Sequence, residues 1–336
     1  MPAVVRVVCL LFLLLLSLAG CSSPASPRPP DAGLVSPDGG EVRLWQDAAI
    51  FTLVGRLIDT AREQVLVEVY ELGRPDLVDA LSAARARGVK VRVITDPTVA
   101  ASRRSVERLK FAGVPVRPYP VDDRRHQIDH VKMLVADAEA AVGGMNWGAH
   151  SDRNHDYVLE TRVAAHLERL LLIFEQDWSL AGGRPAPLHQ LASAVGQTSP
   201  GDEIRKMLEA AFATARRRIL AEIYTLTDPR TVVELVRAHR RGLDVRIVLD
   251  PNQAYNLRAG HMLREAGVDV RWYPVPPGVL LHAKVGLFDA TLIVGSANWT
   301  LSGLGVNHEL DIETEDAQAV AAYGSRFEAD WHRSAA

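Results

Sequence analysis

The chain has 336 residues, of which 48% are hydrophobic, 24% charged and 6% aromatic. This composition excludes a disordered, collagen-like or disulfide-stapled protein, and the length suits one large or two moderate domains. The formal net charge of −3 excludes the strongly basic balance of a dedicated nucleic-acid coat protein, while a local basic groove stays possible.

The first 20 residues have the layout of a secretory signal. A single arginine, Arg6, precedes an apolar run over residues 7–20, which is shorter than the roughly 20 apolar residues that a membrane-spanning helix needs. The tetrapeptide Leu-Ala-Gly-Cys at 18–21 resembles the lipobox of bacterial lipoproteins. The resemblance implies cleavage before Cys21 and lipidation of its sulfur. It predicts a lipid-anchored protein on an extracytoplasmic membrane face of a bacterial cell envelope, the outer membrane if the cell has two. The alternative is a secreted protein with a spare cysteine.

Residues 21–40 contain five prolines and almost no apolar periodicity. They are predicted to form an extended tether between the membrane anchor and the folded body. Cys21 is the only cysteine left after cleavage, so disulfides and thiolate metal sites are excluded from the mature chain.

The body is a tandem repeat. Val-Leu-Val-Glu-Val-Tyr at 65–70 aligns with Ile-Leu-Ala-Glu-Ile-Tyr at 219–224, and Phe-Glu-Gln-Asp-Trp at 174–178 aligns with Phe-Glu-Ala-Asp-Trp at 327–331. We therefore predict one repeat over 41–180, a Gly/Pro/Ser-bearing linker over 181–201 and a second repeat over 202–336.

Each repeat alternates strand and helix signals. Continuous apolar runs at 65–69 and 91–94 predict strands buried on both faces. The segments 75–87 and 229–241 start with proline and are followed by Gly88 and Gly242, which predicts helices. Strand–helix–strand alternation indicates an α/β fold with a helix-flanked sheet in each half.

The pattern that carries chemistry is a repeated His-x-Lys-x4-Asp element. It occurs as His130, Lys132 and Asp137, and again as His282, Lys284 and Asp289. Glycine and asparagine follow in both halves, with Asn146 after Gly143-Gly144 and Asn298 after Gly295-Ser296. Two of only five lysines lie in these elements, although the chain otherwise uses arginine. This indicates that the site requires a compact ammonium group and not a planar guanidinium.

These elements resemble the signature of the phospholipase D superfamily, and the likeness covers about residues 45–333. It implies two similar repeats, each a helix-flanked mixed β-sheet, packed about a pseudo-twofold axis with one shared active site. Two departures lie in the first half: Gly144 stands where serine is common, and Asp156 stands where the second half has Glu309 in an Asn-x-Glu pattern. We expect these departures to change how the first half orients its histidine.

The residue types suit phosphodiester cleavage without a metal or other cofactor. Two histidines can divide the roles of nucleophile and general acid, and analogy with the lipases of the family assigns His130 as nucleophile and His282 as acid. The lysines, both asparagines and Ser296 would hold the phosphate oxygens, while Asp156 and Glu309 would orient the histidines. Asp137 and Asp289 are expected to tie down the following turn.

The substrate class stays open at this point. The predicted anchor favours a phospholipase D-like phosphodiesterase acting on phospholipid headgroups. Attack by the histidine would give a phosphohistidine intermediate, and either water or an alcohol could then cleave it. The pair Arg124-Arg125, five residues before His130, favours a metal-independent nuclease. A third possibility is a non-catalytic phosphate- or lipid-binding module. No obligate protein partner is implied.

Overall fold

The computed structural model describes residues 41–184 and 193–336, which belong to the compact unit Gly33–Ala336. The predicted signal peptide, the tether and Cys21 lie outside the described residues.

The first half carries eleven helices and strands between residues 42 and 181. In chain order they are β1 (Val42–Gln46), α1 (Ala49–Thr60), β2 (Gln64–Val69), α2 (Pro75–Ala86), β3 (Lys90–Thr95), α3 (Arg103–Phe111), β4 (Val116–Pro118), β5 (Lys132–Ala136), β6 (Glu139–Gly143), β7 (Tyr157–Thr161) and α4 (Ala164–Ala181). Three 3-10 turns, Ala100–Ser102, Asp123–Arg125 and Ser151–Arg153, lie in its loops.

The second half repeats this succession of helices and strands in the same order. Its elements are β8 (Val195–Thr198), α5 (Glu203–Thr214), β9 (Arg218–Ile223), α6 (Pro229–Arg240), β10 (Asp244–Leu249), α7 (Asn256–Glu265), β11 (Asp269–Trp272), β12 (Lys284–Phe288), β13 (Thr291–Gly295), β14 (Glu309–Thr314) and α8 (Ala317–Arg333). No 3-10 turn is assigned in the described residues of this half.

Both halves build the same seven-stranded mixed sheet. The strand order is β4-β3-β2-β5-β6-β7-β1 in the first and β11-β10-β9-β12-β13-β14-β8 in the second. Strands β2, β3 and β4 run parallel, whereas β5, β6, β7 and β1 pair antiparallel, and the second sheet repeats this pattern. The α/β class and the repeated architecture are therefore as the sequence predicts.

The local signals mark these elements closely. Helices α2 and α6 begin at Pro75 and Pro229, and the chain leaves them at Gly88 and Gly242, whose φ angles of 93° and 88° suit glycine. The predicted linker differs from the structure at its end, because β8 lies inside it and pairs with β14 as an edge strand. Four residues with small and polar side chains (Val-Gly-Gln-Thr) give little strand signal, and the partner strand decides their conformation.

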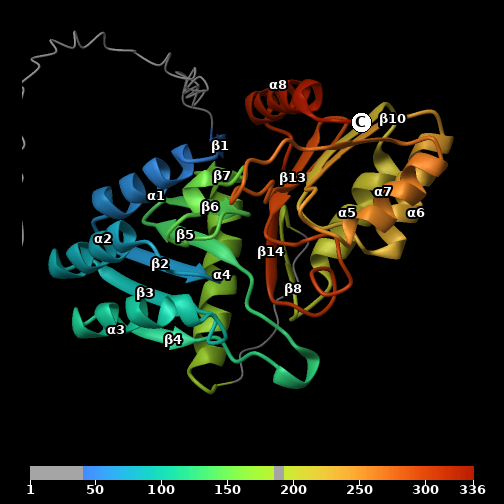
Figure 1. Cartoon of the computed structure of the whole chain (residues 1–336). Coiled ribbons are helices and arrows are strands. Elements are labelled where there is room, and N and C mark those ends of the chain that lie inside the picture. Colours follow the sequence, from blue (N-terminus) through green and yellow to red (C-terminus); the bar gives the residue numbers. More distant parts are fainter. Residues whose placement is uncertain (1–40, 185–192) are drawn as a thin grey trace, which may run out of the picture. The chain divides into compact units, whose positions relative to one another are not determined.

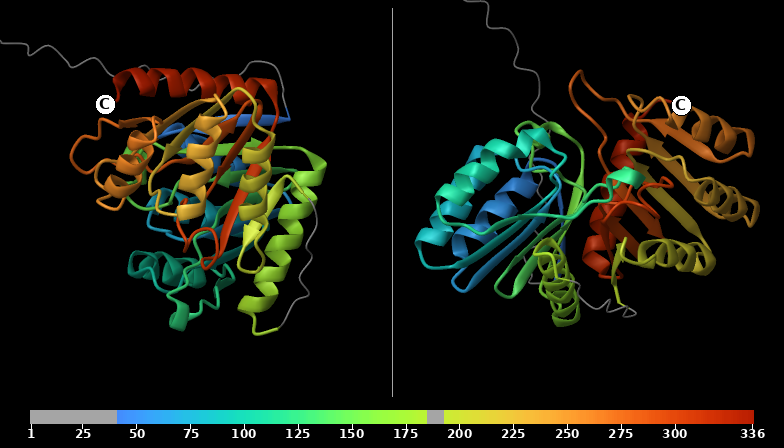
Figure 2. Two further views of the ribbon diagram at one scale, coloured as in Figure 1. Left: turned by 90° about the vertical axis from the view of Figure 1, so that its right-hand side faces the viewer. Right: turned by 90° about the horizontal axis from the view of Figure 1, so that it is seen from below.

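The layers place the two sheets around a common core. Helices α1, α2 and α3 cover one face of the first sheet and α5, α6 and α7 cover the outer face of the second (Figure 1). The central apolar cluster draws on both sheets and on α4 and α8, which lie between the sheets when viewed from below (Figure 2). Strands β6 and β7 of the first sheet contact β13 and β14 of the second. This contact brings the strand ends that carry the signatures together.

In the described ranges, 41–184 and 193–336, no helix combines the length and the apolar character needed to cross a bilayer.

Candidate active site

Each signature histidine lies on a segment that crosses to the other half. The backbone N–H of His130 donates to the carbonyl of His308 (2.8 Å), and that of His282 donates to the carbonyl of His155 (2.8 Å). Two residues later, Lys132 opens β5 and Lys284 opens β12, the strands at the centre of each sheet. The crossing therefore places both His-x-Lys elements at the boundary of the two halves.

His130 is held by the second half. Its Nδ1 donates to Oε2 of Glu309 (2.9 Å) and to the carbonyl of Ser296 (3.0 Å). The imidazole is 5% exposed and Glu309 is fully buried. Because Nδ1 carries the proton for these two acceptors, Nε2 is the nitrogen available to a substrate.

His282 is held by the first half. Its Nδ1 is hydrogen-bonded to Oδ2 of Asp156 at 2.7 Å, and Nζ of Lys284 lies 3.0 Å from the same nitrogen. The expectation that the departures in the first half affect its own histidine is therefore wrong. Asp156 orients the histidine of the second half, because the carboxylates are exchanged across the boundary.

The two departures from the family pattern compensate each other. A Cβ on Gly144 would lie 2.3 Å from Oδ1 of Asp156, so no serine fits beside this carboxylate. In the second half, the longer Glu309 leaves room for Ser296, whose Oγ donates to Oε2 of Glu309 (2.6 Å). The buried hydroxyl of Ser296 is bonded to Glu309 and to the N–H of Leu310, and its expected role toward a phosphate oxygen stays a prediction.

The two lysines are buried behind the histidines. Nζ of Lys132 donates to the carbonyl of His130 (2.6 Å), and Nζ of Lys284 donates to the carbonyl of His282. Each ammonium also faces an aromatic ring at the end of the paired strand, β2 or β9, with Tyr70 at 5.1 Å and Tyr224 at 5.0 Å. Burial lowers the pKa of Lys132 to about 7 and that of Lys284 to about 8.

The two asparagines have free amide oxygens. Oδ1 of Asn146 and Oδ1 of Asn298 are buried and have no hydrogen-bond partner among the described residues. Both residues lie three positions after the ends of β6 and β13. Their role toward a phosphate stays a prediction.

Asp137 and Asp289 lie away from the histidines and hold a turn. Asp137 accepts from the backbone N–H groups of Arg62, Glu63 and Gln64, and Asp289 accepts from those of residues 216–218. The turn is the one that leads into β2 or β9, not the one that follows the aspartate as the sequence predicts. Antiparallel pairing of β5 with β2 brings this earlier segment beside Asp137.

The two histidine–carboxylate pairs differ electrostatically. Burial raises the pKa of Glu309, but His130 and Lys132 lower it below its ordinary value, so this carboxylate is ionised. Burial raises the pKa of Asp156 to about 7. Burial also lowers the pKa of both histidines, and that of His282 is lowered further by Lys284 and Lys132. Near neutral pH the carboxylate of the first pair is ionised, whereas the second pair exchanges a proton with solvent as pH passes through about 7.

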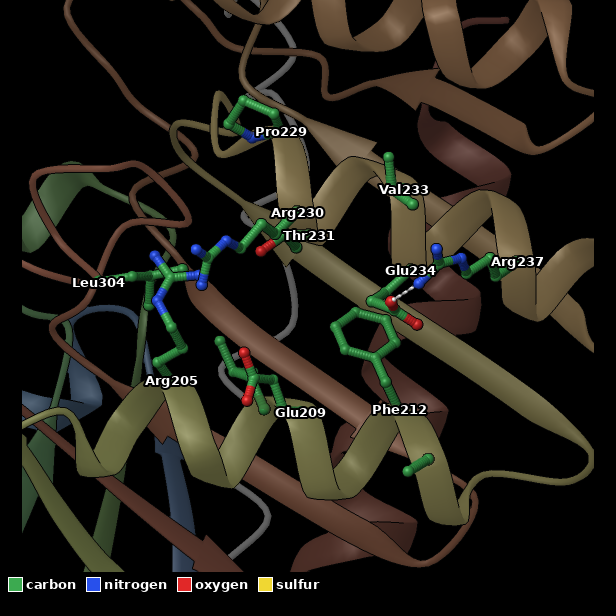
Figure 3. Close-up of a pocket in the computed structure, with 12 residues that line it drawn as sticks. Arg205, Glu209, Phe212, Pro229, Arg230, Thr231, Val233, Glu234, Arg237 and Leu304 are labelled. Atoms are coloured by element: carbon green, nitrogen blue, oxygen red, sulfur yellow. Dashed lines mark hydrogen bonds and ion pairs between the residues drawn. The ribbon is translucent and has the colours of Figure 1, made fainter.

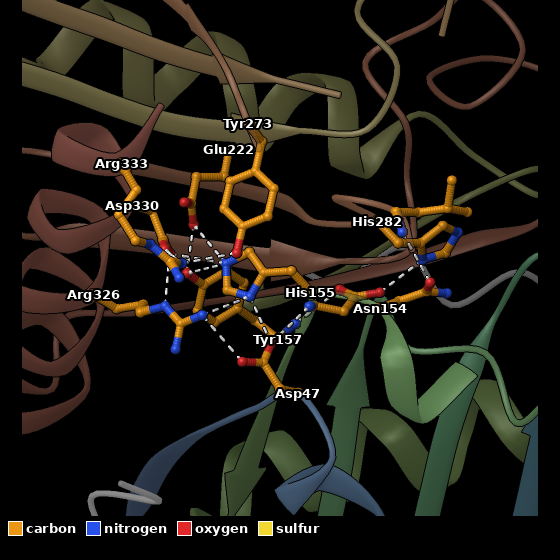
Figure 4. A network of polar contacts seen from close by, with 12 residues as sticks. Asp47, Asn154, His155, Tyr157, Glu222, Tyr273, His282, Arg326, Asp330 and Arg333 are labelled. Atoms are coloured by element: carbon orange, nitrogen blue, oxygen red, sulfur yellow. Dashed lines mark hydrogen bonds and ion pairs between the residues drawn. The ribbon is translucent and has the colours of Figure 1, made fainter. Parts of the chain in front are cut away.

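Two further buried clusters contain the residue types of a metal site. One joins His155, Glu222 and Asp330, and the other joins His308, Glu68 and Asp177. In the first, Asp330 is already paired with Arg326 and Arg333 (Figure 4). Neighbouring carboxylates and tyrosines raise the pKa of both histidines well above the ordinary value despite burial.

These six residues are absent from the predicted site. Their signal is the repeat itself, because Asn-His-Asp at 154–156 aligns with Asn-His-Glu at 307–309, and Glu68 and Asp177 align with Glu222 and Asp330. Repeat-matched buried polar residues beside a signature are candidates for holding it.

A cavity of about 560 Å³ lies apart from the histidines, between α5 and α6 (Figure 3). Phe212, Val233 and Leu304 line it together with Arg205 and Arg230, and it includes none of the predicted site residues.

Comparisons with known proteins agree with this architecture. The family model described as "Cardiolipin synthase, PLD-like domain" matches residues 54–178 and again 208–331. A mixed sheet repeated twice, with paired His-x-Lys elements at the boundary, defines the chain as a two-domain phospholipase D-type protein. The chain belongs to the phospholipase D superfamily and contains the cardiolipin synthase PLD-like domain twice.

The chain is 28% identical over 309 residues to cardiolipin synthase A of Pseudomonas fluorescens (strain SBW25), covering 80% of this chain and 63% of the relative. It is 30% identical over 134 residues to the mitochondrial cardiolipin hydrolase of Homo sapiens, covering 40% of this chain and 53% of the relative. The chain thus spans little more than half the length of these relatives. The crystal structure of phosphatidylserine synthase from Haemophilus influenzae Rd KW20 shares the fold, with a TM-score of 0.70, 12% identity and 86% of each chain covered.

Proposed function

We propose that the protein is a phospholipase D-type phosphodiesterase that cleaves headgroup phosphodiesters of phospholipids through a phosphohistidine, without a metal ion. The observation that carries the proposal is the pair of histidine–carboxylate contacts, His130–Glu309 and His282–Asp156, each completed across the two halves beside a buried lysine.

In the first step, Nε2 of His130 attacks phosphorus and the bond from phosphorus to the leaving oxygen breaks. The leaving oxygen takes a proton from Nε2 of His282. The proton that Asp156 shares with this histidine then moves to Nδ1, so that the ring is neutral again. In the second step, His282 removes a proton from water, the oxygen of which attacks phosphorus while the P–N bond breaks. The products are the free headgroup alcohol and a phosphatidate, and an alcohol in place of water would give transfer instead.

The electrostatic difference between the pairs supports this division of roles. An ionised Glu309 leaves His130 neutral at Nε2 and stabilises the positive charge that its ring gains on phosphorylation. The Asp156–His282 pair carries the proton that a leaving alkoxide needs. Lys132 and Lys284 would stabilise the additional charge on the phosphate oxygens, and a bound phosphate anion would favour their protonated forms.

The two loops that precede the histidines support a lipid substrate. Residues 120–129 of the first half include five charged side chains, with Arg124 and Arg125 exposed. The matching loop at 274–281 has the sequence Pro-Val-Pro-Pro-Gly-Val-Leu-Leu, and its tip at 276–278 is exposed. Such an apolar tip suits insertion among lipid chains, because burying it there removes apolar surface from water, whereas a polyanionic nucleic acid offers it no partner.

The neighbouring segment extends the apolar rim. Nδ2 of Asn252 donates to the carbonyl of Val279 (3.4 Å), which ties the loop to the segment that carries Tyr255 and Leu257. These two side chains are 74% and 61% exposed. Across the site, Arg125 donates to the carbonyl of Gly305 and stays exposed at the charged loop, where an anionic headgroup could reach it.

The proposal includes attachment to an extracytoplasmic membrane face of a bacterial cell envelope through a lipid on Cys21. Lipidation requires the thiol, so Cys21→Ser should move the protein from the membrane fraction to the soluble fraction. Membrane fractionation of the variant at wild-type level would refute the anchor without affecting the catalytic proposal.

The decisive experiment compares two substrates. The protein, with His130→Asn and His282→Asn as controls, is assayed for headgroup release from phospholipid vesicles and for nicking of a supercoiled plasmid. Headgroup release that both variants lose by several orders of magnitude supports the proposal. Nicking without headgroup release would identify a nuclease, and inactivity on both would favour a binding module. A fully active variant would refute the shared site.

A further inference from the structure

Two buried histidines that belong to neither signature are related by the repeat. The His155 cluster consists of His155, Glu222 and Asp330, and the His308 cluster consists of His308, Glu68 and Asp177. In each cluster the histidine comes from one half and both acids come from the other. Nε2 of His155 lies 3.1 Å from Oδ2 of Asp330, and Nε2 of His308 lies 3.2 Å from Oδ2 of Asp177.

Each ring is also fixed on its other nitrogen and on its face. Nδ1 of His155 donates to Oδ1 of Asp47 (2.5 Å), and the ring stacks on Tyr273 with 5.1 Å between centroids (Figure 4). Nδ1 of His308 donates to the carbonyl of Ser199 (3.0 Å), and the ring stacks on Tyr119 at 4.4 Å. Fixed at both nitrogens and on a face, each ring has one orientation.

The backbone of each of these residues contacts the catalytic segment of the opposite half. The carbonyl of His155 accepts from the N–H of His282 (2.8 Å), and its own N–H donates to the carbonyl of Leu280 (2.9 Å). The carbonyl of His308 accepts from the N–H of His130 (2.8 Å), and its N–H donates to the carbonyl of Ile128 (2.9 Å). The next residue along the chain is Asp156 in one case and Glu309 in the other.

We propose that His155 and His308 are positioning residues, His155 aligning the Asp156–His282 pair and His308 aligning the Glu309–His130 pair. The inference rests on the proposed function. Each of these side chains is held by groups of the opposite half, and this contact fixes the backbone of its own residue. The same backbone carries the carboxylate of the next residue and the carbonyl that accepts from the N–H of the signature histidine. A displacement of about 1 Å at such a pair can cost about 100-fold in rate.

The charge of the rings suits this role. Neighbouring carboxylates hold the pKa of both histidines well above the ordinary value. Each imidazolium therefore donates from Nε2 to an acid of the other half, while Nδ1 donates to Asp47 in His155 and to the carbonyl of Ser199 in His308. The His155 cluster is further neutralised by Arg326 and Arg333, whereas both carboxylate oxygens of Glu68 lack a hydrogen-bond partner among the described residues. The His308 cluster therefore depends more strongly on its single imidazolium.

The test uses the leaving group to separate the two residues. First-turnover rates are measured on two soluble phosphodiesters, one with a nitrophenol leaving group, which departs without a proton, and one with an aliphatic alcohol, which needs the acid. For His155→Gln we expect a loss of at least about tenfold with the alcohol and little loss with the nitrophenol. For His308→Gln we expect a similar loss with both, because the nucleophile is impaired.

Two controls keep the outcome specific. His166→Gln replaces another buried histidine, which bonds Thr161 and lies outside both clusters, and it should leave both rates unchanged. If the histidine variants do not fold, the milder Glu222→Gln and Glu68→Gln should reproduce the respective patterns. In the Asp156→Asn background, His155→Gln should add little further loss, since both act on one pair.

The proposal is overturned if His155→Gln and His308→Gln lower the thermal midpoint but leave both rates at wild-type level. It is equally overturned if both variants lose activity without any difference between the two leaving groups. Failure of the proposed function itself is recognised separately, because the unmodified protein would then release no headgroup from phospholipid vesicles, or His130→Asn and His282→Asn would remain active.

Discussion

Replacing Glu309 by glutamine should abolish the nucleophile while preserving the shape of the site. Oε1 of Glu309 accepts from Nδ2 of Asn307 (3.0 Å), and we expect this donor to hold the oxygen of the new amide while the hydroxyl of Ser296 turns its proton away from Oε2. The NH2 group then takes the place of Oε2, which lies 2.9 Å from Nδ1 of His130. Since an NH2 group can only donate, Nδ1 becomes an acceptor and the ring proton moves to Nε2.

This tautomer removes the lone pair that attacks phosphorus. In the Ser-His-Asp triad of serine proteases, replacing the aspartate by asparagine lowers kcat by about 10⁴, because the histidine adopts the wrong tautomer. At 1.36 kcal/mol per factor of ten, this loss corresponds to about 5.5 kcal/mol. We expect a loss of this size for Glu309→Gln in headgroup release, and no trapped phosphohistidine by mass spectrometry.

A matched control lies on the same strand. Glu313→Gln makes the same substitution on β14 at a partly exposed position, and its headgroup release should stay at wild-type level. Circular dichroism and thermal unfolding establish that both variants are folded. A folded Glu309→Gln protein with a rate within tenfold of wild type would refute the tautomer argument.

Three further outcomes follow from the site. kcat/KM should fall as pH rises through about 7 to 8, because Lys132, Lys284 and the Asp156–His282 pair lose protons there, and a flat pH profile through this range would contradict that assignment. Asp137→Ala should lower the free energy of unfolding in urea by about 1–2 kcal/mol, since three backbone N–H groups lose their acceptor. Burial raises the pKa of Asp137, but these N–H groups lower it below its ordinary value. The contribution of Asp137 to the free energy of unfolding is therefore present above the ordinary pKa of aspartate and should disappear as pH falls through the lowered value. An equal loss of stability in Asp137→Ala at all pH values would contradict this. Headgroup release should persist in EDTA, and activity that is lost in EDTA and restored by zinc or magnesium would refute the metal-independent mechanism.

The local features of this protein follow from its sequence. Proline before an apolar helical face and glycine after it mark α2 and α6, and continuous apolar runs mark the central strands, because these signals act within a few residues. The repeat and the doubled His-x-Lys element also indicate the α/β class, the superfamily and the candidate catalytic histidines and lysines. The strand β8 is not predicted from its weak local signal, because its conformation depends on pairing with β14.

The pairing of the catalytic groups is decided by the tertiary structure. His130 and Glu309 are separated by 179 residues and His282 and Asp156 by 126, so no local pattern reveals that each carboxylate serves the opposite half. The same applies to Gly144, whose missing side chain is explained only by the position of Asp156, and to Ser296, whose hydroxyl is bonded to Glu309. Sequence determines which residues each repeat supplies, whereas the packing of two sheets through one apolar core determines which of them meet.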